Sequence, residues 1–364
     1  MKVVTVVGAR PQFIKAACVS RAILSDNAAR GGKGAIQEVL VHTGQHYDDS
    51  MSGIFFRELG IPSPAYNLGV GSGSHGQQTG RMLEAVEQVI ERENPRFVVV
   101  YGDTNSTVAG ALVAAKLRIP IAHVEAGLRS FNRGMPEEIN RVVTDHLSTL
   151  LFCPTQQAER NLASEGLVRG VRVVGDVMYD SVLYYMAQHT GREAVLQQLD
   201  LRPREYALAT IHRAEATSKG DTVFDILEAL GEVGMPVVLP LHPRTRVTLA
   251  SGPRRTIPSA VHVIDPVGYH EMLSLERHAR LILTDSGGVQ KEAFMFKVPC
   301  VTLRDETEWG ETVDSGWNQL AGTSPERILA AVKRALSVRP AETQSPYGDG
   351  HAAERIVECL SQMV

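Results

Sequence analysis

The chain has little cysteine and no recognisable set of metal ligands. Its four cysteines, Cys18, Cys153, Cys300 and Cys359, are far apart and form no CxxC pair, which favours neither a disulfide framework nor a zinc site. We expect all four to be reduced residues of the core. The twelve histidines form no HExxH or similar spacing, so we expect a reaction that needs no metal ion and no other cofactor.

An excess of charge of one sign and long apolar runs are also lacking. The formal net charge is −4, and no long basic run occurs, which argues against nucleic acid or an anionic membrane as the main partner. The five-residue run Val3–Val7 is too short for a secretory signal, and no stretch approaches the length of a membrane span. We therefore expect a cytoplasmic protein with a small polar ligand.

What the sequence does have is a regular alternation of β-branched runs and helical patterns. This alternation is typical of βαβ units and parallel sheets, and 364 residues exceed the usual size of a single core. A charged, strand-poor stretch between Met186 and Glu205 separates two such series. The expected strands are Val3–Val7, Glu38–His42, Phe97–Tyr101, Ile119–Val124, Leu150–Cys153 and Val171–Val174, then Tyr206–Ile211, Val237–Leu241, Ala260–Ile264, Leu281–Thr284 and Pro299–Leu303.

The sequence thus predicts an α/β protein with two doubly wound, Rossmann-like domains. We place the first at 1–187 and the second at 188–349, and we expect a C-terminal helix in 350–364 to pack back on the first domain. Open parallel sheets bind ligands beyond the carboxyl ends of their strands. Candidate residues are therefore those that directly follow a strand.

The first candidate segment is Gly8-Ala9-Arg10-Pro11-Gln12, which leads from the first strand into a helix that carries Lys15. A proline in the first helical turn and an arginine in the loop suit an anion bound at the helix N terminus. The alternative is an ordinary βα turn in which Arg10 is solvated.

Three carboxylates form the second candidate group. Asp103 and Glu125 each follow an expected strand, and Glu137 stands four residues before Arg141 on one helical face. Asp103 could instead serve only as a helix N-cap. Carboxylates in unequal environments can remove and return a proton, because burial raises one pKa and an arginine lowers another. We predict such a cluster around one cleft, with Arg129 and Arg141 beside it.

The second domain offers a candidate phosphate site. Ser286, Gly287 and Gly288 open a helix after the strand Leu281–Thr284, so that backbone amides can approach a phosphate. Glu292, about one turn further on, could reach the hydroxyls of a ribose. Three residues that follow other strands could add cations or donors, namely His212, His242 and Arg244. By contrast, no convincing strand precedes the GxGxxG pattern at 71–76, where we expect a flexible loop.

Nine segments in chain order carry a family resemblance. They are GARPQFIK from Gly8, TGQH from Thr43, GDTNST from Gly102, HVEAGLRS from His123, MPEEINR from Met135, LHPRT from Leu241, TDSGGVQKEA from Thr284, RDETEW from Arg304 and PYGDG from Pro346. Together they resemble the non-hydrolysing UDP-N-acetylglucosamine 2-epimerases. The resemblance implies a glycosyltransferase-B fold with the active site in the cleft between the domains, and a homodimer.

The resemblance also implies the reaction, which inverts C2 of a UDP-sugar. In the family, the C2 proton is removed and UDP is eliminated, giving a glycal, and UDP is then added back with the proton on the other face. By position, Asp103, Glu125, Glu137 and His212 match catalytic residues. The positions that match UDP-binding residues are Arg10, His242, Ser286, Gly287 and Glu292, and further candidates for substrate contact are Lys15, Arg141, Arg244 and Gly288.

Some positions depart from the family pattern. Ala9 and Gln12 replace the threonine and glutamate of a GTRPE motif, and Tyr47 follows TGQH, where an arginine is usual in a region linked to an allosteric UDP-N-acetylglucosamine. These features, together with SFN before MPEEINR, resemble those of a subgroup that acts on UDP-2,3-diacetamido-2,3-dideoxyglucuronic acid for surface-polysaccharide assembly. Arg133 would then be a partner for the substrate carboxylate. Alternatives are a glycosyltransferase of the same fold, a hydrolysing relative and a non-catalytic sensor.

Overall fold

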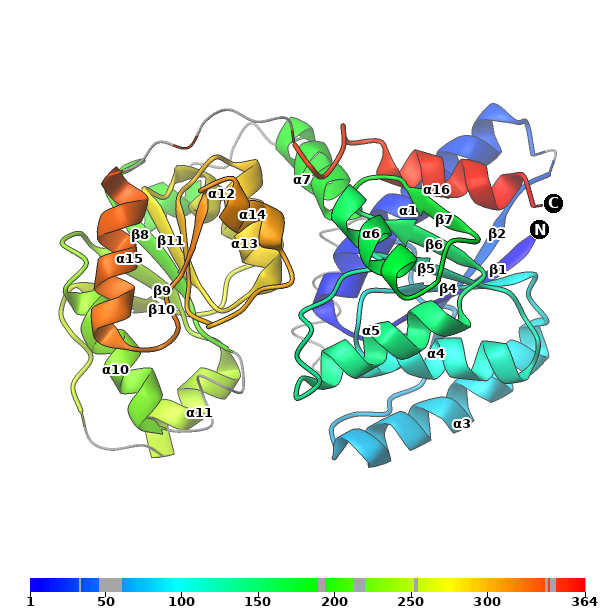
Figure 1. Ribbon diagram of the computed structural model, residues 1–364, viewed down its shortest axis with the longest axis horizontal. Helices are drawn as coiled ribbons and strands as arrows, with labels where there is room; N and C mark the ends of the chain where they lie inside the picture. Colours follow the sequence, from blue (N-terminus) through cyan, green and yellow to red (C-terminus); the bar gives the residue numbers. More distant parts are fainter. Residues whose placement is uncertain are drawn as a thin grey trace. The chain divides into compact units, whose positions relative to one another are not determined.

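The computed structural model describes residues 1–32, 34–45, 61–188, 194–212, 220–251, 255–337, 340 and 345–363 (Figure 1). The chain divides into two compact units, Met1–Tyr184 with Ser345–Val364, and Tyr185–Gln344. Each unit is built around one parallel sheet with helices packed on it. The predicted α/β class with two doubly wound parallel sheets is confirmed.

In the described part of the chain, the first unit has a seven-stranded sheet in the order β3-β2-β1-β4-β5-β6-β7. Its valine-rich central strands β1 and β4 are buried, as expected for parallel strands covered on both faces. The strands are β1 (Lys2–Val7), β2 (Gln37–His42), β3 (Tyr66–Asn67), β4 (Phe97–Tyr101), β5 (Ile121–Val124), β6 (Leu150–Cys153) and β7 (Val171–Val173).

The helices of the first unit form two layers, with α3, α4 and α5 packed side by side in one and α1 packed against α16 in the other (Figure 1). The helices are α1 (Arg10–Ala29), α3 (His75–Glu93), α4 (Asn105–Lys116), α5 (Pro136–Leu147), α6 (Gln156–Ser164), α7 (Val177–Gln188) and α16 (Ala352–Ser361). The chain passes from the first unit to the second within α7.

The described residues of the second unit hold a six-stranded sheet in the order β10-β9-β8-β11-β12-β13. The strands are β8 (Ala207–Thr210), β9 (Val237–Pro240), β10 (Val261–Ile264), β11 (Leu281–Thr284), β12 (Cys300–Thr302) and β13 (Asn318–Leu320). The helices are α8 (Ala194–Gln198), α10 (Gly220–Gly231), α11 (Pro243–Ser251), α12 (Tyr269–His278), α13 (Gly287–Met295), α14 (Gly310–Asp314) and α15 (Pro325–Ser337).

All eleven strands expected from the sequence are present, within one or two residues at each end. The strands that were not predicted are β3 and β13, two of the four edge strands, which have two and three residues and lack a β-branched run. Because β3 ends at Asn67, the expectation of no strand before the GxGxxG segment is wrong. That segment leads into α3, which Ser74 caps by accepting the Gln77 N–H at 3.4 Å.

The cysteines are free thiols in the described structure. Cys18, Cys153 and Cys300 are buried, and burial raises the pKa of each thiol. Cys359 on α16 is only half-buried, so the expectation of a core position is wrong for this residue.

The N terminus of α16 is held by a carboxylate from α7. Asp180 Oδ2 accepts the backbone N–H of Ala353 at 2.7 Å. Burial raises the pKa of Asp180 from an ordinary 3.8 to about 6, with a further rise from Asp176, whereas N–H donation from Ala353 and nearby His351 act in the opposite direction. The ionised carboxylate is therefore less favourable in the folded chain than in the unfolded one.

Replacing Asp180 by Asn should stabilise the protein at pH 7, by up to roughly 3 kcal/mol. Because the folded-state pKa lies above the unfolded-state value, this carboxyl contributes stability below about pH 4 and loses it as the pH rises through about 6. Asparagine does not titrate, and its Oδ1 can still accept from Ala353. Urea unfolding at pH 4 and pH 7 measures the effect; a stability difference that does not change between them would contradict the prediction.

Candidate functional site

The candidate residues gather where each sheet reverses its winding. In the first unit the reversal lies between β1 and β4, and in the second it lies between β8 and β11. Doubly wound sheets bind ligands at this switch point, beyond the carboxyl ends of the strands. Gly8–Gln12 follows β1 and Asp103 follows β4, while His212 and Ser286 follow β8 and β11. The sheet topology thus gives each unit one candidate site.

Gln12 ties two strand ends together in the first unit. Its Oε1 accepts the N–H groups of Gly8 and Ala9 at 2.8 and 3.0 Å, and its Nε2 donates to the Tyr101 carbonyl and to Thr107 Oγ1 at 2.9 and 3.0 Å. A glutamate could not donate to a carbonyl unless it were protonated. The departure from GTRPE therefore has a structural role at the switch point.

Glu125 is held by a buried cation. Its carboxylate Oε2 forms an ion pair with Lys15 Nζ from α1, and the two residues are only 6% and 8% exposed. The backbone of Glu125 lies in the left-handed region, with φ of +75°, which is strained for a residue with a β-carbon. The N–H groups of Glu125 and Ala126 donate to the Phe152 carbonyl at 3.1 and 3.0 Å and so hold this turn.

Asp103 is more accessible and pairs with a buried arginine. Its Oδ2 lies 2.6 Å from Arg141 Nη2, and its side chain is 31% exposed. Thr104, rather than Asp103, caps α4 by accepting the Thr107 N–H at 3.3 Å. The alternative that Asp103 serves only as an N-cap is therefore excluded.

Glu138, which was not predicted as a site residue, orients Arg141. Glu138 Oε2 accepts from Arg141 Nη1 at 2.7 Å, and the carboxylate also accepts the N–H groups of Ser130 and Phe131, each at 2.9 Å. Burial alone would raise the pKa of Glu138, but these hydrogen bonds outweigh it and lower the pKa. The i,i+3 spacing of Glu138 and Arg141 was a signal that could have identified it.

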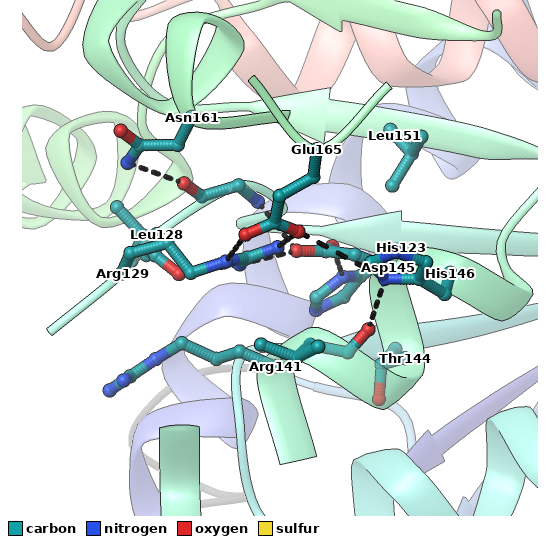
Figure 2. Close-up of polar contacts among 12 residues, drawn as sticks. His123, Leu128, Arg129, Arg141, Thr144, Asp145, His146, Leu151, Asn161 and Glu165 are labelled. Atoms are coloured by element: carbon teal, nitrogen blue, oxygen red, sulfur yellow. Dashed lines mark hydrogen bonds and ion pairs between the residues drawn. The ribbon is translucent and has the colours of Figure 1, made fainter. Parts of the chain in front are cut away.

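The other two residues predicted for this cluster behave differently. Glu137 is half-buried in the first turn of α5, beside Glu138 in the sequence. Arg129 does not stand beside the candidate carboxylates as predicted, because it pairs with Asp145 and Glu165 (Figure 2). Arg141 does pair with Asp103, as predicted, and the cation paired with Glu125 is Lys15.

Arg129 belongs to a buried network behind the HVEAGLR turn (Figure 2). Asp145 accepts from His123 Nδ1, from Arg129 Nη1 and from the Gly127 N–H, at 2.7, 2.7 and 3.1 Å. Arg129 also donates from Nε and Nη2 to the two carboxylate oxygens of Glu165, each at 2.7 Å. Although burial would raise the pKa of Asp145, His123 and Arg129 hold it below its usual range.

Gly127 should not tolerate a side chain. Its φ is +81°, and a β-carbon would lie 2.3 Å from the Ala158 carbonyl oxygen. We expect Gly127→Ala to destabilise the protein by about 3 kcal/mol or more, from backbone strain and overpacking together. Gly166→Ala is a matched control with the same φ of +81° and no atom within 4 Å, and it should cost only about 1 kcal/mol. Equal losses in denaturant unfolding would contradict this prediction.

In the second unit, His212 lies against a buried aspartate. The His212 N–H donates to Asp285 Oδ2 at 2.8 Å, and the ring Nδ1 lies 2.8 Å from Asp285 Oδ1, within ion-pair distance. Asp285 is completely buried, whereas about a third of the His212 side chain is exposed. The His242 ring lies 5.5 Å from the His212 ring, centroid to centroid. Asp285 belongs to the segment TDSGGVQKEA but was not predicted as a site residue.

The start of α13 has the form expected of an anion site. Ser286 caps the helix by accepting the Val289 N–H at 3.4 Å, which leaves its own hydroxyl proton to donate. A β-carbon at Gly287 would lie 2.5 Å from Glu308 Oε1, so a larger residue here would require the Glu308 side chain to shift. Glu292 is buried, and its Oε1 accepts from the Tyr269 hydroxyl at 3.2 Å. Gly288 stands beside Gly287 in the first turn.

Some predicted positions lie outside the described residues. The side chains of Arg10 and Arg244 are among them, although both residues belong to helices, α1 and α11. Tyr47 also lies outside. Within the described residues, no group of three or more His, Cys, Asp and Glu side chains could hold a metal ion. None of the described helices is both long and apolar enough to cross a membrane.

Comparison with known proteins assigns the family. Residues 29–361 match the family model described as UDP-N-acetylglucosamine 2-epimerase. The chain belongs to this family. The resemblance carried by the nine sequence segments is thereby confirmed, and the chain is an isomerase of the UDP-sugar 2-epimerase class.

Two curated relatives are equally similar to this family member. One is a UDP-N-acetylglucosamine 2-epimerase homolog of Methanococcus maripaludis, and the other is the UDP-2,3-diacetamido-2,3-dideoxy-D-glucuronate 2-epimerase of Pseudomonas aeruginosa. Each is 50% identical over 100% of both chains. Sequence identity therefore does not choose between the two substrates.

Solved structures support the fold. The chain matches the crystal structure of Methanocaldococcus jannaschii UDP-GlcNAc 2-epimerase in complex with UDP-GlcNAc and UDP, with a TM-score of 0.90 and 43% identity over 100% of both chains. It also matches the Neisseria meningitidis UDP-GlcNAc 2-epimerase bound to UDP-GlcNAc, with a TM-score of 0.85 and 30% identity over 100% of both chains. The predicted glycosyltransferase-B type of fold is confirmed.

Proposed function

We propose that the protein inverts C2 of a UDP-N-acetylhexosamine, converting UDP-N-acetylglucosamine to its manno epimer by elimination and re-addition of UDP. The observation that carries this proposal is the pair of carboxylates at the switch point of the first unit. Asp103 and Glu125 follow neighbouring strands, and each has its own cation, Arg141 and Lys15. Two carboxylates in unequal environments suit removal of a proton from one face and its return on the other.

In this proposal the residues of the first unit handle the C2 proton. The Glu125 carboxylate is buried and fixed by Lys15, whereas Asp103 is partly exposed. The two carboxylates thus differ both in burial and in their cationic partners. Glu137, half-buried in the first turn of α5, is proposed as the third catalytic carboxylate on its family position.

The residues of the second unit are proposed to hold UDP. The N–H groups of Gly287 and Gly288 and the Ser286 hydroxyl at the start of α13 suit the diphosphate. His212, with Asp285 beside it, is suited to stabilise the charge on departing UDP. Contacts from His242 and from the side chains of Arg10 and Arg244 are proposed on the family positions alone, as is ribose contact by Glu292.

A second substrate has one specific observation in its favour. UDP-2,3-diacetamido-2,3-dideoxyglucuronic acid carries an additional carboxylate, and Arg133 has an exposed side chain between Ser130 and α5. The curated relative from Pseudomonas aeruginosa, named for that substrate, is 50% identical. The reaction at C2 would be unchanged.

A cytoplasmic homodimer that serves surface-polysaccharide assembly is proposed on the family resemblance.

Proton NMR in D2O with each substrate separately tests the proposal. Deuterium at C2 and signals of the manno epimer should appear with UDP-N-acetylglucosamine. The same changes with the diacetamido uronate alone would transfer the function to that substrate. Unchanged spectra with both would refute C2 epimerisation of these two substrates.

A further inference from the structure

Each carboxylate-bearing turn of the first unit is bonded through its backbone to residues behind it. The Gly102 carbonyl, directly before Asp103, lies 2.8 Å from His123 Nε2, and the Gly102 N–H donates to the Val124 carbonyl at 3.0 Å. In the HVEAGLR turn, two residues after Glu125, the Gly127 N–H donates to Asp145 Oδ2 at 3.1 Å. One buried pair, His123 and Asp145, therefore contacts both turns.

The two turns also contact each other. Gly102 has φ of +61°, and a β-carbon there would lie 3.2 Å from both Glu125 Oε2 and Lys15 Nζ. A shift of the Gly102 peptide would therefore reach the Lys15–Glu125 ion pair as well as Asp103.

The pair is held by hydrogen bonds to both turns and to Arg129. His123 and Asp145 are completely buried. The ring Nε2 of His123 lies 2.8 Å from the Gly102 carbonyl, which can only accept a hydrogen bond, and Nδ1 lies 2.7 Å from Asp145 Oδ1. Asp145 Oδ2 accepts from the Gly127 N–H and from Arg129 Nη1. Arg129 in turn pairs with Glu165, which ends the network.

We propose that His123 and Asp145 are positioning residues that fix the two turns carrying Asp103 and Glu125 in the geometry needed for proton transfer at C2. This inference rests on the proposed function. The pair does not touch substrate; it acts through the Gly102 carbonyl and the Gly127 N–H. Because a displacement of about 1 Å at reacting groups can cost about 10²-fold in rate, loss of these bonds should reduce kcat.

Three variants test the proposal. His123→Leu removes the donor to Gly102, His123→Gln offers an amide donor in its place, and Asp145→Asn removes the charge between His123 and Gly127. The matched control is Glu165→Gln, which alters the same network at an end that bonds only Arg129 among the network residues. For each protein we would measure kcat, KM, the rate of C2 deuterium incorporation in D2O, UDP affinity and thermal unfolding.

We expect His123→Leu and Asp145→Asn to lower kcat and C2 exchange about 10²-fold, with UDP affinity unchanged. His123→Gln should recover about tenfold over His123→Leu, while Glu165→Gln should stay within about threefold of the wild type. A purely structural role would lower stability without this order of kcat values.

Retention of wild-type kcat by folded His123→Leu would overturn the proposal, and so would failure of both His123 variants to fold, since the ring would then act in stability. If only Asp145→Asn fails to fold, the comparison of kcat between His123→Leu and His123→Gln tests the proposal. Failure of the proposed function can be told apart from failure of this inference, because the wild type itself would then show no C2 exchange.

Discussion

Replacing Glu125 by Gln is expected to lower kcat about 10²–10⁴-fold, the range that a positioned general acid or base contributes. The substitution keeps the size of the side chain but removes the charge that Lys15 pairs with. Because Glu125 is not among the residues proposed to bind UDP, UDP affinity should stay close to that of the wild type. Kinetics with the substrate identified by NMR, together with UDP titration, measure both quantities.

The same substitution should reduce stability, because Lys15 would remain buried without its counter-charge. Breaking one side of a buried ion pair typically costs about 3–5 kcal/mol. Glu93→Gln is a matched control in the same unit, since Glu93 pairs with Lys2 at 3.0 Å away from the candidate site. That variant should keep full activity. A Glu125→Gln enzyme within threefold of wild-type kcat would exclude Glu125 from proton transfer.

Most of the fold could be predicted from the sequence because its strands are runs of β-branched residues. Phe97–Tyr101 and Leu281–Thr284, for example, have the bounds that the sequence predicts. The missed strands Tyr66–Asn67 and Asn318–Leu320 are short, and tertiary pairing to one neighbour forms them rather than local propensity.

The candidate site was predictable only in part. The residues that directly follow strands, such as Asp103 and Glu125, stood out by their position. Glu138, Asp145 and Asp285 did not, because their roles depend on partners far away in the sequence or on a choice between adjacent carboxylates. Asp145, for example, bonds His123, which lies 22 residues earlier. A pattern read along one chain does not give such pairings, and it assigned Arg129 to the wrong carboxylates.

The charged groups of the two units are proposed to act in different steps, and variants can test each step separately. In the first unit, buried cations hold the carboxylates proposed to move a proton. In the second, a buried carboxylate, Asp285, holds a histidine proposed to stabilise a leaving diphosphate. Substitutions in the first group should change kcat with little effect on UDP affinity, and substitutions in the second should change both.

Asp285→Asn is the test of the second group, and we expect it to lower kcat about 10²–10⁴-fold, as loss of a histidine-orienting aspartate can. The carboxylate Oδ1 lies 2.8 Å from His212 Nδ1 and holds the ring in one orientation, in which it is proposed to stabilise the negative charge that develops on UDP. Asparagine could still accept the His212 N–H but would not supply the charge. UDP affinity should therefore fall together with kcat, unlike in Glu125→Gln.

Asp265→Asn provides the matched control for this result. Asp265 is in the same unit and pairs with Arg246 at 2.7 Å, but its side chain is 87% exposed, and such surface pairs contribute about 0–1 kcal/mol. It should therefore leave kcat and UDP affinity unchanged. If Asp285→Asn lowered kcat while UDP affinity remained that of the wild type, His212 would act on the sugar rather than on the diphosphate. If neither quantity changed, the contact between Asp285 and His212 would serve only to join β8 to β11.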